Sequence, residues 1–240
     1  MAAAEQSKAL FVTGTDTGVG KTLVTSALAR HLVNKGLRVG VMKPVETGVA
    51  DCSRLGADAT LLKWAANSSQ PDDEICPYRL QAPLAPAVAA SREKIRINYS
   101  ALLSQAQNII DQHDFTLIEG AGGLLVPLAG GLLMADFAKA IEIPLLVVCR
   151  PNLGTINHTL LTLYCARSME LEVAGYLLNN MPESKSVAEE TAPHSLASLT
   201  SEELLGVLTA VSGSEREKVE QLVGQIGELP TYSLLARHLP

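Results

Sequence analysis

Aromatic residues are scarce in this sequence of 240 residues. They make up 4% of the chain, whereas apolar residues of all kinds make up 47%. Leucine, valine, isoleucine and alanine must therefore fill the core, a composition that suits a parallel sheet covered by helices on both faces. The length fits one large α/β domain and is also compatible with two compact ones.

Blocks of basic residues and long apolar runs are also missing. The net charge is −6, and the basic surface that binds nucleic acid has no counterpart in the sequence, so we expect no nucleic-acid partner. The apolar runs are too short or too interrupted to span a bilayer. The C-terminal SLLARHLP has too few basic residues for strong membrane affinity. We therefore expect no membrane partner.

Cysteine is sparse, and its spacing excludes the common paired motifs. Cys52, Cys76, Cys149 and Cys165 are widely separated and form no CxxC pair. We interpret them as reduced thiols of a cytoplasmic protein. Residues 1–8 are short and polar and have no signal-peptide core, which agrees with that interpretation.

The hydrophobic pattern predicts alternating strands and helices. Strands are expected at residues 9–13, 38–45, 115–119, 144–149, 173–178 and 204–211. Helices are expected at residues 21–35, 55–66, 99–112, 135–141, 155–169 and 215–226. The proline-rich segment 71–86 is expected to be a loop over one end of the sheet. Together they predict one doubly wound α/β domain over residues 1–240, with a mostly parallel sheet and helices on both faces.

A glycine-rich segment, GTDTGVGKT, joins the first predicted strand to the first predicted helix. This is the context of a phosphate-binding P-loop, in which backbone N–H groups at a helix start point at phosphate oxygens. Lys21 can reach the β- and γ-phosphates, and the Thr22 hydroxyl can bind Mg²⁺. The loop is one residue longer than the usual pattern. We expect ATP or a close relative to bind, with Mg²⁺, along Thr15, Asp16, Thr17, Gly18, Val19, Gly20, Lys21 and Thr22.

Three carboxylates are candidates to complete the metal site. Asp16 lies in the loop, Asp58 lies near the start of the second helix, and Glu119 ends a predicted strand. The first two also have structural readings, as a turn former and as a first-turn helix residue. Glu119 lies at the carboxyl edge of the sheet, where open α/β sheets bind ligands. The Gly120-Ala121-Gly122-Gly123 cluster that follows lets a phosphate or substrate approach the backbone.

Lys43 lies near the carboxyl end of the second predicted strand, on the same sheet edge as the P-loop. Its ammonium can point at transferring phosphate oxygens or at a carboxylated substrate. A solvated lysine at a strand end is the alternative reading.

Five motifs, in this order, resemble the dethiobiotin synthetase family: GTDTGVGKT, KPVETG, GADATLL, IEGAGG and NLGTINHTLLT. The resemblance runs from about residue 10 to about residue 180, and the long P-loop with an internal aspartate is the family's form. It implies a P-loop NTPase type of fold and an ATP-dependent cyclo-ligase that acts as a homodimer. The substrate would be 7,8-diaminononanoate, which takes up CO₂ as a carbamate. Phosphorylation of the carbamate by ATP and ring closure would give dethiobiotin, ADP and phosphate.

The resemblance also implies residue roles. Lys43 and Lys21 would clamp the reacting anions, and Thr22, Asp58 and Glu119 would hold Mg²⁺. Thr47 would contact substrate, and Asn179, followed by Asn180, would read the nucleotide base. The substrate's tail carboxylate would be held across a dimer interface by a helix start formed by Gly154, Thr155, Ile156 and Asn157.

The sequence departs from the family pattern near Gly206, where relatives carry Gly-x-Ile-Pro and this chain has Gly-Val-Leu-Thr. We therefore keep a loose base pocket as a hypothesis. The main alternative function is a P-loop regulatory ATPase of the partition or septum-positioning type. Those proteins carry a lysine early in the loop, where this chain has Asp16. A corrinoid-type amidotransferase synthetase and a non-catalytic nucleotide-binding module are further alternatives.

Overall fold

The computed structural model describes residues 8–240, so the expectation for the N-terminal segment falls, apart from Lys8, outside the described residues. Six parallel strands form the central sheet, in the order β10-β9-β8-β1-β5-β2. These strands are β1 (Ala9–Gly14), β2 (Val39–Met42), β5 (Phe115–Glu119), β8 (Leu145–Cys149), β9 (Val173–Met181) and β10 (Leu204–Thr209). The predicted doubly wound α/β fold of P-loop type is confirmed.

The central strand β1 divides the core into two faces. Leu10 and Val12 pack into one hydrophobic cluster, while Ala9 and Phe11 pack into another. This alternation follows from the two-residue period of a strand. Both sets are fully buried, as the continuous apolar run predicted.

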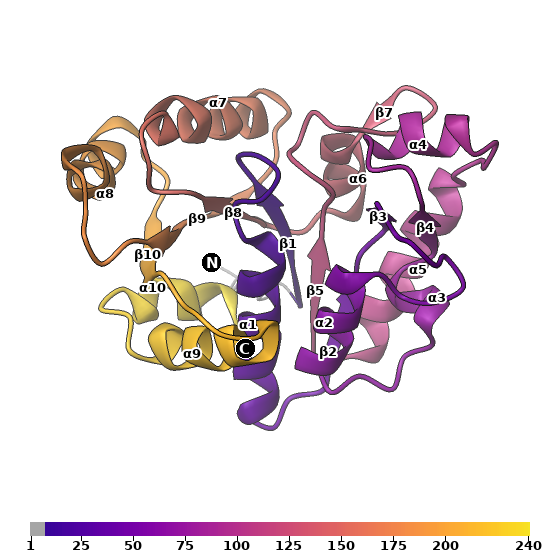
Figure 1. Ribbon diagram of the computed structural model, residues 1–240, viewed down its shortest axis with the longest axis horizontal. Helices are drawn as coiled ribbons and strands as arrows, with labels where there is room; N and C mark the ends of the chain where they lie inside the picture. The colour runs from indigo at the N-terminus through magenta and orange to yellow at the C-terminus, as the bar shows by residue number, and fades with distance from the viewer. Residues whose placement is uncertain (1–7) are drawn as a thin grey trace, which may run out of the picture.

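Helices cover both faces, and Figure 1 shows α7 and α8 on the opposite side of the sheet from α1 and α9. One face carries α1 (Lys21–Asn34), α2 (Ala57–Ala65) and α9 (Glu215–Gly227), with the short α3 (Asp72–Ile75) and α10 (Tyr232–Leu235). The other carries α4 (Pro86–Arg92), α5 (Tyr99–Gln112), α6 (Met134–Ile141), α7 (Thr155–Ser168) and α8 (Val187–Leu199). A 3₁₀ turn (Ala236–His238) follows α10. Among residues 8–240, no helix is both long and apolar enough to cross a membrane.

The strand predicted at residues 38–45 is wrong in its second half. The chain leaves the central sheet after Met42, and the N–H of Lys43 donates to the Ile75 carbonyl at 2.7 Å instead. Pro44 has no N–H and cannot continue a sheet ladder. The next strand, β3 (Val45–Thr47), pairs with β4 (Tyr78–Leu80) in a separate two-stranded sheet. That pairing also corrects segment 71–86, which contains α3 and β4 and is not wholly a loop.

Several ordered elements were not predicted from the sequence, among them α4, α10 and the two regions described next. A small hairpin joins β6 (Pro127–Ala129) to β7 (Leu132–Leu133), and α8 fills much of the stretch after β9. Ser186 and Glu189 form a capping box at the start of α8. The Ser-x-x-Glu pattern was the available signal for this helix.

Candidate active site

The P-loop connects β1 to α1 at the centre of the sheet, and two of its glycines are left-handed. Gly18 has φ 73° and Gly20 has φ 91°. A Cβ at Gly20 would lie 2.1 Å from the side-chain nitrogen of Asn179. That nitrogen donates to the Val19 carbonyl at 3.0 Å, and Asn179 is buried. The end of β9 therefore braces the loop from behind, and only glycine fits at position 20.

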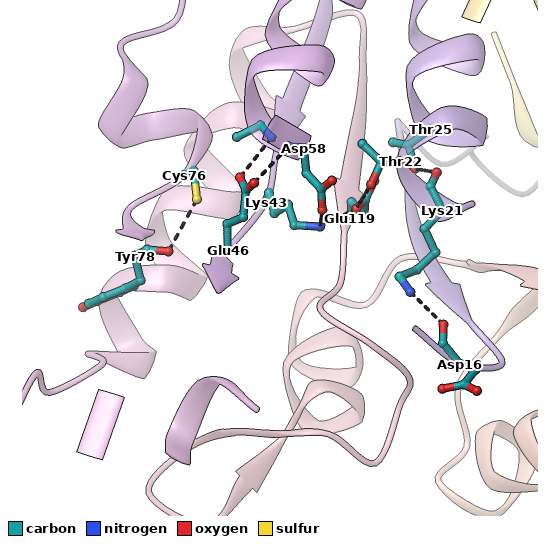
Figure 2. A network of polar contacts seen from close by, with 11 residues as sticks. Asp16, Lys21, Thr22, Thr25, Lys43, Glu46, Asp58, Cys76, Tyr78 and Glu119 are labelled. Atoms are coloured by element: carbon teal, nitrogen blue, oxygen red, sulfur yellow. Dashed lines mark hydrogen bonds and ion pairs between the residues drawn. The ribbon is translucent and has the colours of Figure 1, made fainter. Parts of the chain in front are cut away.

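Lys21 is buried at the start of α1 and points back along the loop. Its ammonium donates to the backbone carbonyl of Asp16 at 3.0 Å (Figure 2). Burial lowers the pKa of Lys21, against the opposing attraction of Glu119. An anion placed in the loop would relieve the cost of this buried charge.

The Asp16 side chain is held from outside the loop. Its carboxylate accepts a hydrogen bond from Arg150 at 2.7 Å and one from the N–H of Thr17 at 2.7 Å. Arg150 follows the end of β8, and its Nε is buried without a partner among the described residues. The sequence analysis did not single out Arg150. Its position just after an apolar strand, on the edge that carries the P-loop, was the available signal.

Lys43 lies between the two carboxylates that the sequence analysis assigned to a metal. Its Nζ is 2.7 Å from Asp58 Oδ2 and also contacts Glu119 Oε1 (Figure 2). The Lys43 side chain is 6% exposed and that of Glu119 is fully buried. Burial by itself lowers the pKa of Lys43, but attraction to Glu119 and Asp58 is larger in sum and raises it above its ordinary value. The lysine is therefore a cation held in place, not a solvated residue at a strand end.

Oxygen atoms suited to a divalent cation gather at the same point. The Thr22 hydroxyl donates to Glu119 Oε1 at 2.8 Å. Glu119 Oε2 is buried and has no hydrogen-bond partner among residues 8–240. A buried carboxylate oxygen without a partner is costly unless a ligand or ion binds it. Within the described chain no group of three His, Cys, Asp or Glu side chains is arranged to hold a metal ion. A metal here would therefore need phosphate oxygens and waters to complete its shell, as Mg²⁺ commonly does.

Glu46 is a buried carboxylate beside this network that the sequence analysis did not identify. Its two oxygens accept the N–H groups of Asp58 and Ala59 at 2.9 and 3.0 Å. Burial raises the pKa of Glu46, and the two N–H bonds oppose that shift. A glutamate in KPVETG, just after Lys43, was the only sequence signal for it.

One cavity of about 530 Å³, called the main cavity below, is lined by P-loop residues and by both lysines. The sequence-predicted residues that line it come from α1, α2, β3, β5 and the connecting loops. They are Thr17, Gly18, Gly20, Lys21, Thr22, Lys43, Thr47, Asp58, Glu119, Ala121 and Gly122. Glu46 also lines this cavity. Gly120 lies at the edge of the sheet that borders the cavity, and its N–H donates to the Val12 carbonyl.

Two smaller cavities adjoin the P-loop. One, of about 170 Å³, lies behind Val19 and is lined by Asn179, Asn180, Thr209 and Lys218 among others. The other, of about 480 Å³, runs from Thr15, Asp16 and Thr17 to His158 and Leu161 of α7.

The predicted tail-carboxylate site is the set that the structure brings neither to the main cavity nor to the two adjoining ones. Gly154, Thr155, Ile156 and Asn157 form the start of α7 and line neither the main cavity nor the adjoining ones. Gly154 is the left-handed N-cap, with φ 97°. Among residues 8–240, this helix start therefore does not line the P-loop cavity.

The fold is shared with known nucleotide-binding proteins. Residues 8–218 match a protein-family model described as an AAA domain. The septum site-determining protein MinD complexed with Mg-ADP, from Pyrococcus horikoshii OT3, has a similar structure, with a TM-score of 0.57 and 16% identity, covering 96% of this chain and 93% of that one. Fold and site together define a P-loop nucleotide-binding α/β protein.

Curated relatives identify the family within this class of P-loop proteins. An ATP-dependent dethiobiotin synthetase from Thermodesulfovibrio yellowstonii is 39% identical over 219 residues, which is 87% of this chain and 91% of the relative. Another, from Bacillus subtilis strain 168, is 38% identical over 216 residues, which is 90% of this chain and 93% of the relative. The chain belongs to the ATP-dependent dethiobiotin synthetase family. The resemblance given by its motifs is confirmed, and the likeness to MinD is a likeness of fold alone.

Proposed function

We propose that this chain, as one synthetase domain over residues 1–240, converts 7,8-diaminononanoate, CO₂ and ATP into dethiobiotin, ADP and phosphate. Membership of the family supports the overall activity. The observation that carries the residue assignment is the convergence of Lys21, Lys43 and the Thr22–Glu119 pair on one cavity. Such a cavity can hold two anions, a carbamate and a γ-phosphate, close together.

The two lysines have distinct roles in this proposal. Lys21 binds the β- and γ-phosphates and gains a partner for its buried charge. Lys43 faces the carbamate oxygen and the γ-phosphate as the new O–P bond forms and ADP leaves. The second amine then attacks the carbamate carbon, closes the ring and releases phosphate, which makes the enzyme a cyclo-ligase. Thr47, which lines the same cavity, offers a hydroxyl to the substrate.

Mg²⁺ fits the donor set of the site. Thr22, Asp58 and Glu119 would hold it, and the unpartnered Oε2 of Glu119 supports that assignment. The Asp16 carboxylate pairs with Arg150 and does not line the same cavity. When bound, Mg²⁺ neutralises phosphate charge during transfer. Hard oxygen donors and an incomplete protein shell agree with its preference for phosphate and water ligands.

The nucleotide base is proposed to bind behind Val19, in the cavity lined by Asn179 and Asn180. The side-chain nitrogen of Asn179 already donates to the P-loop, which leaves its oxygen to accept from the base. Turnover with ATP, CTP and GTP at equal Mg²⁺ tests how selective the pocket is. A preference for ATP of ~100-fold or more, equal to about 2.7 kcal/mol, would rule out a loose pocket.

A homodimer is proposed because the start of α7 does not reach the main cavity of its own chain. Exposed apolar side chains lie along and beside α7: Leu125, Leu153, Leu161 and Tyr164. Covering them with a second copy would bury apolar surface, and Gly154 to Asn157 would then serve the partner's substrate carboxylate through helix N–H groups. We further propose a cytoplasmic location, consistent with four free cysteines, and neither nucleic-acid nor membrane partners.

One experiment tests the proposed function. The protein is incubated with MgATP, bicarbonate and 7,8-diaminononanoate, and phosphate release is measured with and without the diamine. Release that depends on the diamine, with dethiobiotin as product, is the expected result. Hydrolysis at a similar rate without the diamine would favour the regulatory ATPase alternative.

A further inference from the structure

Helix α2 begins without a capping side chain of its own. Its N-cap residue is Gly56, and no side chain of the N-cap accepts a hydrogen bond there. The first N–H groups of a helix lack partners within the helix and are normally satisfied by the N-cap side chain. In this protein the two oxygens of Glu46, on β3, accept the N–H groups of Asp58 and Ala59 instead, at 2.9 and 3.0 Å.

The fit between strand and helix start is close. A Cβ at Gly56 would lie 2.2 Å from Glu46 Oε1, so glycine at this position lets the carboxylate approach the helix. Glu46 is 6% exposed, and Figure 2 shows its carboxylate directed at the start of α2 and Lys43 beside it. Its negative charge is also favourable at the positive end of the helix dipole.

The position of Asp58 depends on this contact. Asp58 is the second residue of α2, and its carboxylate contacts the Lys43 ammonium from the helix start that Glu46 holds. We propose that Glu46 is a positioning residue, which fixes the α2 start so that the Asp58 carboxylate faces the metal and phosphate position. The proposal rests on the proposed function, because it assigns Asp58 to Mg²⁺.

A direct role is the competing explanation. Glu46 lines the main cavity next to Thr47, so its carboxylate could attract a substrate ammonium. Each of its oxygens is already engaged by an N–H group, however. A group that orients a metal ligand should change metal dependence, whereas a group that binds the diamine should change the KM for the diamine.

A double-mutant cycle distinguishes the positioning role of Glu46 from direct binding of the diamine. ATP affinity is measured by titration calorimetry without diamine, in Mg²⁺ and in EDTA, for wild type, Glu46→Ala, Asp58→Ala and the double variant. We expect the Mg²⁺-dependent gain in ATP affinity to fall by ~10-fold in Glu46→Ala, the scale typical of residues that orient metal ligands. Because Glu46 acts through Asp58, the double variant should match Asp58→Ala.

Two further variants guard against a purely structural effect. Glu46→Gln keeps one acceptor oxygen in nearly the same shape, so it should restore part of the Mg²⁺ dependence lost in Glu46→Ala. Ser186→Ala removes the cap of α8, a helix that does not line the main cavity. It should lower the unfolding temperature and leave Mg²⁺-dependent ATP binding unchanged.

Additive losses in the cycle, or a raised KM for the diamine with unchanged Mg²⁺ dependence, would overturn the positioning role. Failure of the proposed function looks different. In that case wild type itself would show no Mg²⁺-dependent gain in ATP affinity and no diamine-dependent phosphate release, and both proposals would fall.

Discussion

The ammonium of Lys43 lies 2.7 Å from the carboxylate of Asp58, on the side of the site where Glu119 also contacts it. One lysine thus pairs with both of the carboxylates proposed to hold Mg²⁺. Metal and lysine share the same partners, so binding of one changes the charge balance of the other. Two predictions depend on this arrangement.

Removing Lys43 should reduce turnover more than nucleotide binding. In Lys43→Ala we expect kcat to fall by ~100-fold or more, because the ammonium matters most as charge develops during transfer. Steady-state kinetics together with ATP titration check this. Lys21→Ala is the matched comparison, since it should abolish activity and also weaken ATP binding. Unchanged turnover in Lys43→Ala would show that the role belongs to another group.

Removing the ammonium should also make the nucleotide-free site bind cations better. Lys43→Met keeps the aliphatic chain and leaves the carboxylates of Asp58 and Glu119 without their counter-ion. We expect Mn²⁺ affinity without nucleotide to rise by ~10-fold, well within the ~4 kcal/mol of two unit charges 4 Å apart at an effective dielectric constant of 20. Titration followed by the Mn²⁺ spin-resonance signal measures it. Equal affinities in wild type and variant would mean that the lysine does not compete with metal.

The brace between β9 and the P-loop predicts different costs for two glycine substitutions. Both Gly18 and Gly20 are left-handed, and a side chain there costs roughly 1–2 kcal/mol. At Gly18 a Cβ meets nothing within 4 Å, whereas at Gly20 it meets Asn179 at 2.1 Å. The free energy of unfolding should therefore fall by ~1 kcal/mol for Gly18→Ala and by clearly more for Gly20→Ala. Denaturant titration compares them, and equal losses would contradict the brace.

The four thiols should differ in reactivity. Burial raises the pKa of Cys76 and of Cys149 to about 12 in each case, so at pH 8 almost none of either is the reactive thiolate. Iodoacetamide should leave both unlabelled in the native protein and label them after denaturation. Cys52 is half-buried and serves as the internal reference, which should react first. Native labelling of Cys149 at the rate of Cys52 would contradict the buried environment.

The sequence predicted the central sheet well because its strands are continuous apolar runs between turn residues. It could not place the break after Met42. Pro44 is visible in the sequence, but its presence alone does not show whether the strand ends before it or includes it. That depends on which residue accepts the hydrogen bond of the chain at this point, and here that residue is Ile75. Helix α8 could have been predicted, because the capping box at Ser186 is visible in the sequence.

The candidate site also contains residues that the sequence predicts and residues that it does not. The P-loop and Glu119 were predictable, because glycine spacing and strand ends carry local signals. Glu46 and Arg150 were not, because their roles depend on the partners that folding brings to them, which are the N–H groups of Asp58 and Ala59 for Glu46 and the Asp16 carboxylate for Arg150. Arg150 reaches Asp16 across 134 positions, and no local pattern marks such a pair.

The bond from Asn179 to the carbonyl of Val19 links residues 160 positions apart. A P-loop is often treated as a portable motif of strand, loop and helix. Here its shape is completed by a strand that is synthesised much later, so a fragment ending before β9 would carry every residue of the motif without its brace. ATP binding to truncated chains would therefore report when folding of the domain has reached that strand.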